Sequence, residues 1–282
     1  MHVLLTGATG YISSSVLDRL REHGHDVTAP VRSQEKADAV SARGATGLVT
    51  DFGDGARLVE LMRGSDAVIH LASDAEDPEG FDRRVAEAAI EALGGTGRPY
   101  VHTGGVWVYG AGDSITETDP TDPPALTAWR LGVVDLLEQA DLPLTVIHPA
   151  IVYGGGKGIA MSLADAPRTD DGRLTTVGSG EQHWTTVHVD DLAELYVAVV
   201  EAGGGFDHVL GVNGDNPRVI DITAAFAGAD GVATEEPDAT RARLGDLFAE
   251  ALLVDQQAAG DKARAIGGWR PTRPTLLEEL GE

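Results

Sequence analysis

A glycine-rich turn near the start of the chain is the first feature able to do chemistry. Gly7, Gly10 and Ser13 recur every third residue within TGATGYISSSV, residues 6–16. A short apolar run precedes this segment and an amphipathic pattern follows it, which predicts a strand that turns directly into a helix. Glycines at such a turn let a phosphate approach the free amides and the positive dipole of the helix N-terminus. The alternative is a strand-to-helix turn that holds no ligand.

Ser13 departs from the Gly-x-x-Gly-x-x-Gly spacing that would place a third glycine at this position. A glycine there normally lets the helix pack closely against the strand, and serine adds only a Cβ atom and a hydroxyl. We therefore expect the packing to be retained. Because Ser13 lies in the first turn of the predicted helix, we also expect its hydroxyl to be able to face the phosphates.

The ends of the second and third predicted strands indicate which cofactor binds. VTAPVRS ends in Arg32 and Ser33, where a site for NAD usually has an acidic residue that holds the ribose hydroxyls. A guanidinium suits the 2′-phosphate of NADP, so NADP(H) is favoured over NAD(H), the alternative being a solvated arginine. In TDFGD, Asp51 is placed to meet an adenine amino group, or it caps the next helix, a role that Asp54 fits better.

Apolar strand patterns alternate with amphipathic helical patterns over the first half of the chain. This alternation implies parallel pairing with right-handed crossovers, and hence an α/β fold with a Rossmann-like, doubly wound parallel sheet. The predicted strands are 2–5, 26–29, 47–50, 67–71, 100–103 and 144–148, and the predicted helices are 12–22, 33–42, 55–63, 80–93, 125–139 and 190–201.

The regular pattern weakens after Tyr153, which indicates a smaller C-terminal substrate-binding lobe. We assign residues 1–152 and about 184–205 to the dinucleotide-binding domain. The substrate-binding lobe then comprises residues of about 153–183 and 206–282.

Composition limits the partners and the compartment. The 282 residues include 45 acidic residues and 21 Lys or Arg, and the formal net charge of −24 argues against nucleic acid and anionic membranes as partners. Cysteine is absent, which excludes disulfides and thiol catalysis. Since we find neither a signal peptide nor an apolar run of membrane-spanning length, we expect a cytoplasmic protein whose partner is a small-molecule substrate.

Seven segments occur in order along nearly the whole chain: TGATGYIS, TDFGD, DAVIHLAS, VHTGGVWVYG, VIHPAIVYGGG, WTTVHVDDLAELY and GWRPTRPTLLEEL. Together they resemble the extended or atypical short-chain dehydrogenases/reductases, the NAD(P)-dependent epimerase/dehydratase group. The resemblance implies an NAD(P) cofactor with its nicotinamide near Thr103 and residues 148–152, and a substrate between the lobes. The implied cofactor contacts are Gly7, Thr9, Gly10, Tyr11, Ile12, Ser13, Arg32, Ser33, Asp51, Phe52, Leu71, Ala72, Ser73, Thr103, His148, Ala150 and Ile151.

The catalytic residues that the resemblance implies are missing from their usual place. Such enzymes usually carry Tyr-x-x-x-Lys on the helix that corresponds to 125–139, where the lysine lowers the tyrosine pKa for proton exchange with the substrate. This segment has ALTAWRLGVV and contains neither residue type, so Arg130 is the candidate for holding a ribose or a developing oxyanion. Thr103, Tyr109, Tyr153 or water are the candidate replacements for the proton donor.

Aromatic residues near these motifs indicate what the pocket binds. Trp107, Trp129 and Trp184 fall in or beside pocket motifs and suit a flat, apolar substrate, the alternative being ordinary core packing. His148, His183 and His188 are too scattered to predict a ligand cluster, so we expect no metal.

Two classes of function remain open. The first is an NADP-dependent oxidoreductase acting on a small aromatic or polycyclic carbonyl or unsaturated substrate. The second is a non-redox protein on the same scaffold, either a cofactor-binding isomerase or cyclase or a regulator that senses NADP(H). By analogy with the family, we expect a homodimer formed through helices 80–93 and 125–139.

Overall fold

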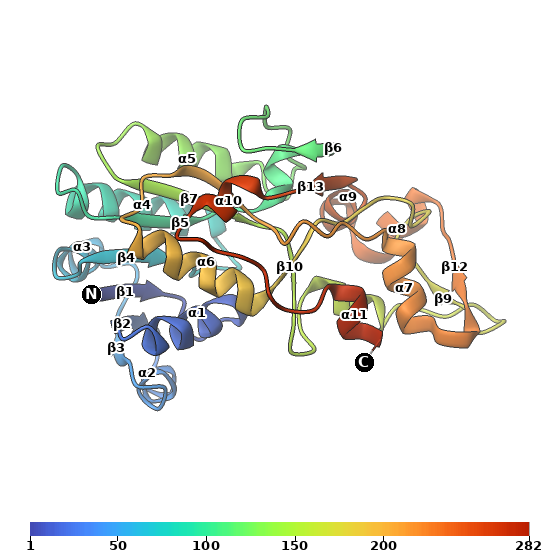
Figure 1. The fold of residues 1–282 in the computed structure, drawn as a ribbon, viewed down its shortest axis with the longest axis horizontal. Coiled ribbons are helices and arrows are strands. Elements are labelled where there is room, and N and C mark those ends of the chain that lie inside the picture. Colours follow the sequence, from blue (N-terminus) through green and yellow to red (C-terminus); the bar gives the residue numbers. More distant parts are fainter. Residues whose placement is uncertain (282) are drawn as a thin grey trace.

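The structure is a computed structural model that describes residues 1–281 and is built around a seven-stranded sheet. All neighbouring strands are parallel, so their carboxyl ends lie at one edge of the sheet (Figure 1). The strand order is β11-β7-β5-β4-β1-β2-β3. The strands are β1 (His2–Thr6), β2 (Asp26–Val31), β3 (Thr46–Val49), β4 (Ala67–His70), β5 (Tyr100–Thr103), β7 (Leu144–Pro149) and β11 (Asp207–Gly211).

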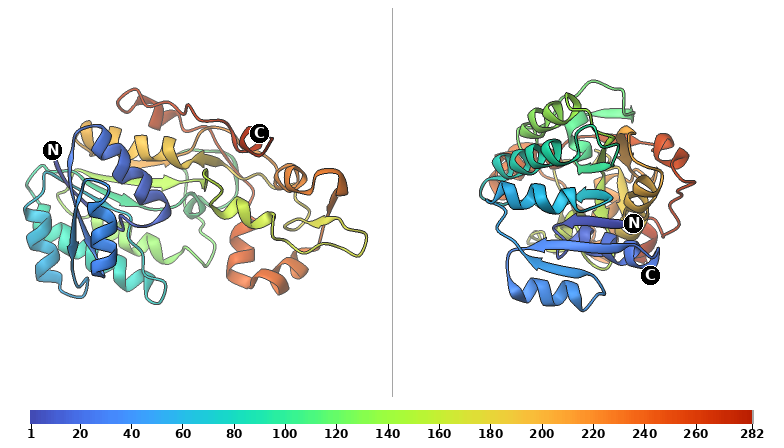
Figure 2. Two further views of the ribbon diagram at one scale, coloured as in Figure 1. Left: turned by 90° about the horizontal axis from the view of Figure 1, so that it is seen from below. Right: turned by 90° about the vertical axis from the view of Figure 1, so that its left-hand side faces the viewer.

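Helices cover both faces of this sheet (Figure 2). One face is covered by α1 (Tyr11–Glu22), α2 (Gln34–Ser41) and α6 (Val189–Glu201), whose apolar side chains share a core with the strands. The other face is covered by α3 (Gly55–Arg63), α4 (Pro78–Leu93) and α5 (Trp129–Glu138), which form a second core with the sheet. Because both faces are buried, the strands are almost continuously apolar, as is usual for parallel sheets.

The six predicted strands and six predicted helices are all present close to their predicted positions. The largest difference is the start of α5, which begins at Trp129 because the proline-containing segment before it forms turns. The predicted doubly wound sheet is therefore confirmed. Sheet growth reverses direction between β1 and β4, the position at which ligands bind in open parallel sheets.

The seventh strand, β11, differs from the predicted division of the chain. The weakening pattern places residues from 206 onward in the second lobe, whereas β11 pairs with β7 at the edge of the main sheet. The strand begins at Asp207, which has a φ of 54°, and it has few consecutive apolar residues. So short a run carries no signal that separates it from the strands of a neighbouring lobe.

The second lobe consists of short elements around a separate core that includes Tyr153, Trp184 and Ile222. Its helices are α7 (Val219–Ala227), α8 (Pro237–Leu244), α9 (Asp246–Leu252) and α11 (Leu276–Gly281), while α10 (Asp261–Ala265) packs beside β11. The two-stranded pairings outside the main sheet join β8 (Ile151–Tyr153) to β10 (Thr186–His188), β9 (Leu174–Thr175) to β12 (Val232–Ala233), and β6 (Gly112–Ile115) to β13 (Gln256–Ala258).

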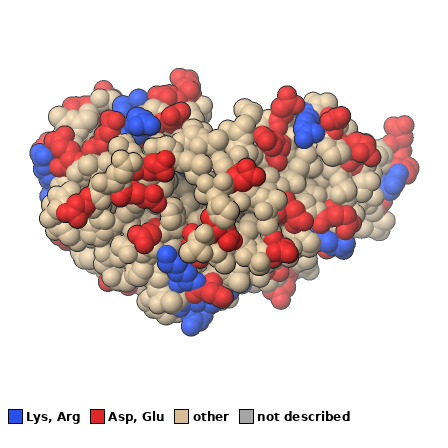
Figure 3. All heavy atoms as spheres, turned by 90° about the horizontal axis from the view of Figure 1, so that it is seen from above, with Lys and Arg blue, Asp and Glu red and all other residues tan. Residues whose placement is uncertain are grey.

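Acidic side chains dominate the charged surface, as the composition requires. In the face drawn in Figure 3 they are scattered over both parts of the molecule, with fewer Lys and Arg between them. Among residues 1–281, no helix combines the length and the apolarity that crossing a bilayer requires.

Candidate functional site

The glycine-rich turn lies at the reversal point of the sheet, between β1 and α1. Gly7 has a φ of 76°, and a Cβ atom there would lie 2.7 Å from the backbone of Ala72, just after β4. The Gly10 amide donates to the Gly7 carbonyl at 2.8 Å, and Gly10 is the N-cap of α1. No side chain within residues 1–281 caps this helix, so its first-turn amides remain open to an anionic ligand.

Ser13 retains the close packing of α1 on the strand but does not face a phosphate. Its side chain is buried, and its hydroxyl donates a hydrogen bond to the Gly7 carbonyl. The serine therefore ties the helix to the turn through a bond that a glycine would lack. The one hydrogen of this hydroxyl is thus directed at the Gly7 carbonyl and not at a phosphate site, which differs from the predicted orientation.

Two cavities lie along the groove on the β2 side of this turn. A cavity of about 360 Å³ covers the turn and is lined by residues that include Gly7, Thr9, Gly10, Leu71, Ala72 and Ser73. A second cavity of about 410 Å³ is lined by residues that include Thr50, Asp51 and Arg84. Arg32, Phe52 and Phe81 line both cavities. The structure thus brings together most of the cofactor contacts that the resemblance implies.

Arg32 and Ser33 have different roles at the end of β2. The Arg32 guanidinium lies in the groove, and its Nη2 atom donates to the Asp74 carboxylate at 2.7 Å. The Ser33 hydroxyl instead accepts the Lys36 amide at 3.3 Å and caps α2. Ser33 is therefore a structural cap, which a serine directly before a helix commonly is.

Asp51 and Asp54 divide the two roles considered for them. The Asp51 carboxylate accepts the Gly53 amide at 2.8 Å and lines the cavity of about 410 Å³. Asp54 caps α3 by accepting the Arg57 amide at 3.1 Å, as expected. Asp51 thus remains available to a ligand in the groove.

A third cavity, of about 540 Å³, lies on the β5 side of the turn and is named the wide cavity here. Its walls include Thr103, Ala150 and Ile151, the residues predicted to lie near a nicotinamide. Trp107 and Trp129 also line it, which agrees with their predicted place in a pocket. The lining residues otherwise include apolar groups such as Ile12, Pro78, Leu126 and Ile159.

Thr103 presents a hydrogen-bond acceptor to the wide cavity. Its hydroxyl donates to the His70 carbonyl at 2.7 Å and lies 2.8 Å from the hydroxyl of Tyr196 on α6. Because a threonine hydroxyl has one hydrogen and the His70 carbonyl can only accept, Tyr196 is the donor in the second bond. Thr103 therefore keeps a lone pair, but no free proton, for a group in the cavity.

Arg130 is the one cation among the described residues that line the wide cavity. Its Nη1 atom donates to the Thr103 carbonyl at 3.2 Å and lies 3.8 Å from the Asp82 carboxylate. The guanidinium lies 4.6 Å from the centre of the Trp129 ring. Burial lowers the pKa of Arg130, with Asp82 opposing, yet an arginine stays charged under these conditions.

A buried cluster of Asp82, His70 and His102 lies beside Arg130 and fixes its position. Asp82 lies 3.2 Å from His70 and 3.7 Å from His102, and all three side chains are almost fully buried. Burial opposes ionisation of Asp82, but its hydrogen bond to His70 and the neighbouring charges keep its pKa below the usual range. Burial lowers the pKa of His102 to about 3, so this imidazole is neutral. The carboxylate thus holds the Arg130 guanidinium in place.

Three predicted site residues lie outside the wide cavity. Tyr109 is buried with its ring against that of His148, at 5.2 Å between centroids. The Tyr153 hydroxyl donates to the Pro274 carbonyl at 2.7 Å, and the Trp184 indole donates to the Leu252 carbonyl at 3.0 Å. Tyr109, Tyr153 and Trp184 therefore pack in cores, and their predicted roles in proton transfer or substrate binding are corrected. Sequence motifs place them near the site but do not show which way they point.

His148, predicted to contact the cofactor, is buried beneath the cavity wall rather than in it. Its Nε2 atom lies 2.9 Å from the Nδ1 atom of His208, and its Nδ1 atom lies 3.3 Å from the Gly105 carbonyl. Burial, followed by the charge of His208, lowers the pKa of His148 to about 3. A neutral, enclosed imidazole of this kind fixes the position of the segment at Gly105.

The sequence reasoning missed Lys36, Asp74 and Phe81, which line the cavities, and Tyr196, which is buried behind them and bonds to the cavity residue Thr103. Lys36 follows Arg32 by four residues, a spacing that would have indicated a second cation near the same ligand. Asp74 directly follows the strand-end segment 71–73, so its position also carried a signal. Phe81 lies on α4 and Tyr196 on α6, and no motif predicts their orientation.

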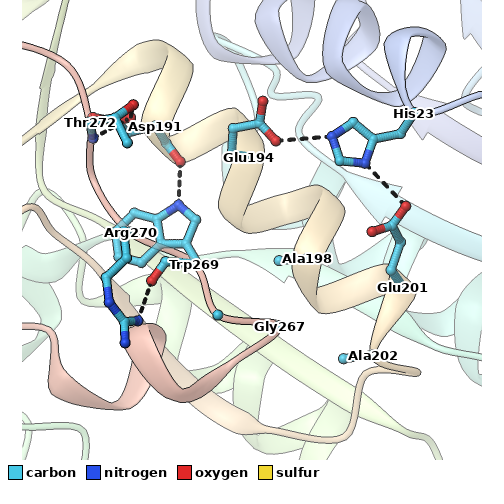
Figure 4. A pocket seen from close by; sticks show the side chains of 11 residues that line it. His23, Asp191, Glu194, Ala198, Glu201, Ala202, Gly267, Trp269, Arg270 and Thr272 are labelled. Atoms are coloured by element: carbon cyan, nitrogen blue, oxygen red, sulfur yellow. Dashed lines mark hydrogen bonds and ion pairs between the residues drawn. The ribbon is translucent and has the colours of Figure 1, made fainter.

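A separate groove lies between α1, α6 and the segment that precedes α11 (Figure 4). His23 lies 3.2 Å from both Glu194 and Glu201, and the Trp269 indole donates to the Asp191 carbonyl at 2.7 Å. The two His23 pairs tie the end of α1 to α6, while the Trp269 bond holds the C-terminal segment against α6. Residues 1–281 contain no group of three or more His, Asp or Glu in an arrangement that could hold a metal ion.

The sequence profile of the NAD dependent epimerase/dehydratase family matches residues 3–211, which contain the glycine turn and most of the wide cavity. The chain belongs to this family. A UDP-glucose 4-epimerase of Mycolicibacterium smegmatis is 32% identical over 313 residues, covering 96% of this chain and 94% of the epimerase. A 3-diazoavenalumate denitrifying reductase of a Streptomyces species is 28% identical over 314 residues, covering 100% of this chain and 99% of the reductase.

Solved structures agree with the family assignment at the level of the fold. The human epimerase family protein SDR39U1, in a structure with NADPH, aligns with a TM-score of 0.74 at 19% identity and covers 99% of both chains. The epimerase/dehydratase family is named for NAD, whereas this neighbour holds NADPH, so the comparisons support a nicotinamide cofactor without selecting one. In the present chain, by contrast, α5 contains neither tyrosine nor lysine.

Proposed function

We propose that this epimerase/dehydratase family member is an NADP(H)-dependent oxidoreductase acting on a small, flat aromatic or polycyclic carbonyl or unsaturated compound. The observation that carries the proposal is the run of neighbouring cavities from Arg32 to Arg130. The cavity over the glycine turn shares Arg32 with the one beyond it and Ser73 with the wide cavity. When bound there, the cofactor supplies or accepts a hydride.

The charges at the β2 end of the groove support NADP(H) over NAD(H). Arg32 and Lys36 both line the cavity over the turn, and β2 ends without the acidic residue that a ribose diol would use. Arg32 already binds an oxyanion, the Asp74 carboxylate, in this structure. A 2′-phosphate offers the same guanidinium a stronger, doubly charged acceptor.

The wide cavity supports a flat substrate with one polar oxygen. Trp107 and Trp129 provide aromatic surface, while Arg130 provides the one positive charge among its described lining residues. A carbonyl oxygen that becomes negative during hydride addition would be stabilised by such a guanidinium. The Streptomyces relative is named as a 3-diazoavenalumate denitrifying reductase, which supports a redox function.

Proton supply in this proposal comes from water. Tyr11 is the one tyrosine among the described residues that line the wide cavity, and its hydroxyl donates to the Gly154 carbonyl at 2.8 Å. Thr103 keeps only an acceptor for the cavity. Arg130 would therefore hold either a cofactor ribose hydroxyl or the substrate oxygen, and water would protonate the product.

The lack of a free tyrosine hydroxyl among the described residues that line the wide cavity also favours a second candidate. A non-redox protein that keeps the cofactor bound, either as an isomerase or cyclase or as a sensor of NADP(H), needs no such donor. The two candidates differ in one observable: only the oxidoreductase shows a substrate-dependent change in the NADPH absorbance band.

Cofactor titration tests the cofactor part of the proposal. Wild-type protein should bind NADP(H) more tightly than NAD(H), and Arg32→Ala should weaken NADP(H) binding about tenfold or more without weakening NAD(H). Arg57→Ala, which removes an exposed arginine paired with Glu60 on α3, is the matched control and should change neither affinity. Equal affinities for the two cofactors in the wild-type protein would overturn the 2′-phosphate assignment.

A further inference from the structure

An ion pair crosses the end of the groove in which the proposed cofactor lies. Arg32 follows β2 and Asp74 follows β4, two strands that lie on opposite sides of β1 in the sheet. The Arg32 Nη2 atom and the Asp74 Oδ2 atom are 2.7 Å apart. The pair therefore spans the carboxyl end of the central strand, where a ligand in the groove must pass.

Asp74 is held in position by the backbone of its own loop. Its Oδ1 atom accepts the amides of Glu76 and Asp77 at 2.9 and 3.2 Å. These two backbone bonds, and after them the Arg32 charge, lower the pKa of Asp74, so the carboxylate is ionised around neutral pH. One oxygen is thus fixed by the loop, while the other is directed at Arg32.

Two aromatic rings hold the arginine on the other side. The Arg32 Cζ atom lies 6.0 Å from the centre of the Phe52 ring and 5.5 Å from that of Phe81, and the two rings are 5.4 Å apart. The same three residues line both cavities at this end of the groove. Arg32 is therefore the one cation within residues 1–281 that faces both cavities and already has an anionic partner.

We propose that Asp74 is a specificity-determining residue that competes with the 2′-phosphate of NADP(H) for Arg32. This inference rests on the proposed NADP(H) site. A guanidinium directed at Asp74 must exchange the carboxylate for the phosphate when NADP(H) binds, because the two anions repel each other at one short contact. NAD(H) has no 2′-phosphate and makes no such exchange. Asp74 thus lowers the affinity for NADP(H) and reduces the difference in affinity between NADP(H) and NAD(H).

Asp74→Asn is the sharpest test, because asparagine keeps a carbonyl oxygen for the amides of Glu76 and Asp77, while the charge is lost and an NH2 group replaces the oxygen that accepts from Arg32. The pair is partly exposed, so we expect NADPH to bind about threefold to tenfold more tightly and NADH to change less than about twofold. Glu76→Gln is the matched control, because Glu76 is exposed and lies two residues after Asp74. Removing its charge should leave the affinities for NADPH and NADH unchanged. Dissociation constants from calorimetry are the readout.

A double-mutant cycle separates competition for Arg32 from plain charge repulsion. In an Arg32→Ala background, Asp74→Asn should change NADPH affinity less than about twofold, because the contested partner is gone. A gain that persists in that background, or an equal gain for NADH, would overturn the competition. Wild-type binding of NADPH with no change in Asp74→Asn would overturn it too while leaving the proposed function intact. Absence of NADP(H) binding in all variants would contradict both.

Discussion

The hydroxyl groups of Thr103 and Tyr196 lie 2.8 Å apart, although 93 residues separate them in the chain. Thr103 also donates to the His70 carbonyl, so its only hydroxyl hydrogen is occupied and Tyr196 is the donor between the two hydroxyls. The arrangement makes Thr103 an acceptor at the end of β5. It therefore fixes the orientation of a bound group rather than supplying a proton to it.

Variants of Thr103 should reflect this orienting role. Thr103→Val should lower kcat/KM about tenfold, the worth of one hydrogen bond, and Thr103→Ser should stay close to wild type. Tyr196→Phe should affect turnover less than Thr103→Val does. It should reduce the free energy of unfolding by about 1 kcal/mol, since it removes a buried hydrogen bond. A loss of several hundredfold in Thr103→Val would show instead that this hydroxyl transfers the proton.

Arg130 should be the most sensitive residue of the wide cavity. If it stabilises a substrate oxyanion, Arg130→Gln should lower kcat on the order of 10²-fold and leave NADPH affinity unchanged. If it holds the cofactor ribose, the same variant should weaken NADPH binding instead. Arg83→Gln, on the exposed surface of the neighbouring α4, is the control. Wild-type kinetics and cofactor affinity in Arg130→Gln would remove Arg130 from the site.

The tryptophans should separate into substrate contacts and a core residue. Trp107→Ala should raise the KM of an aromatic substrate, because the loss of the indole should weaken substrate binding by about 1–3 kcal/mol. The affinity for NADPH should be retained. Trp184→Phe should leave KM unchanged and lower thermal stability, because the indole is buried and bonded to the Leu252 carbonyl. Equal effects of the two variants on KM would contradict the assignment of Trp107 to the cavity wall.

Two buried histidines should make the fold sensitive to acid. Burial lowers the pKa of His102 and of His148 to about 3, whereas an unfolded histidine titrates near 6.5. Between these pH values the unfolded chain therefore binds protons at these histidines and the folded chain does not. The free energy of unfolding present above about pH 6.5 is consequently lost as pH falls toward 3. Urea unfolding at several pH values should show His102→Asn losing less stability than wild type between pH 7 and 5. Identical pH dependence would contradict a neutral buried His102.

The sheet could be predicted because each strand of a two-sided parallel sheet is a short apolar run, and such runs alternate with helical patterns along this chain. The glycine turn could be predicted because only glycine tolerates both the positive φ and the close approach of the Ala72 backbone at position 7. Spacing did not separate Trp107, in the cavity wall, from Trp184, in a core, since both fall in or beside motifs of the predicted pocket.

Partners across the fold were beyond the reach of the sequence. Asp74 meets Arg32 from 42 residues away, and Tyr196 on α6 meets Thr103 at the end of β5 from 93 residues away. The missing Tyr-Lys pair in α5 was visible in the sequence, but the hydrogen bonds that occupy Tyr11 and Tyr153 were not. Those bonds depend on backbone carbonyls whose positions only the tertiary structure defines.

Association through the outer helices remains a prediction. α4 and α5 pack side by side on one face of the sheet, so they offer a continuous helical surface to a second copy. Light scattering at micromolar concentration should report a homodimer, and Glu87→Arg on the exposed side of α4 should dissociate it. Glu22→Arg on α1 is the matched control and should not. A monomeric wild-type protein would contradict this arrangement.

Single-turnover absorbance of NADPH tests the central claim most directly. Flat aromatic carbonyl and unsaturated compounds are first selected by their quenching of tryptophan fluorescence, which is retained in Trp184→Phe and lost in Trp107→Ala. Mixed with the NADPH complex, at least one such ligand should bleach the NADPH band in one turnover, with a slower rate in Arg130→Gln. If compounds that bind the wide cavity beside NADPH leave the band unchanged, the protein is not an oxidoreductase of this substrate class.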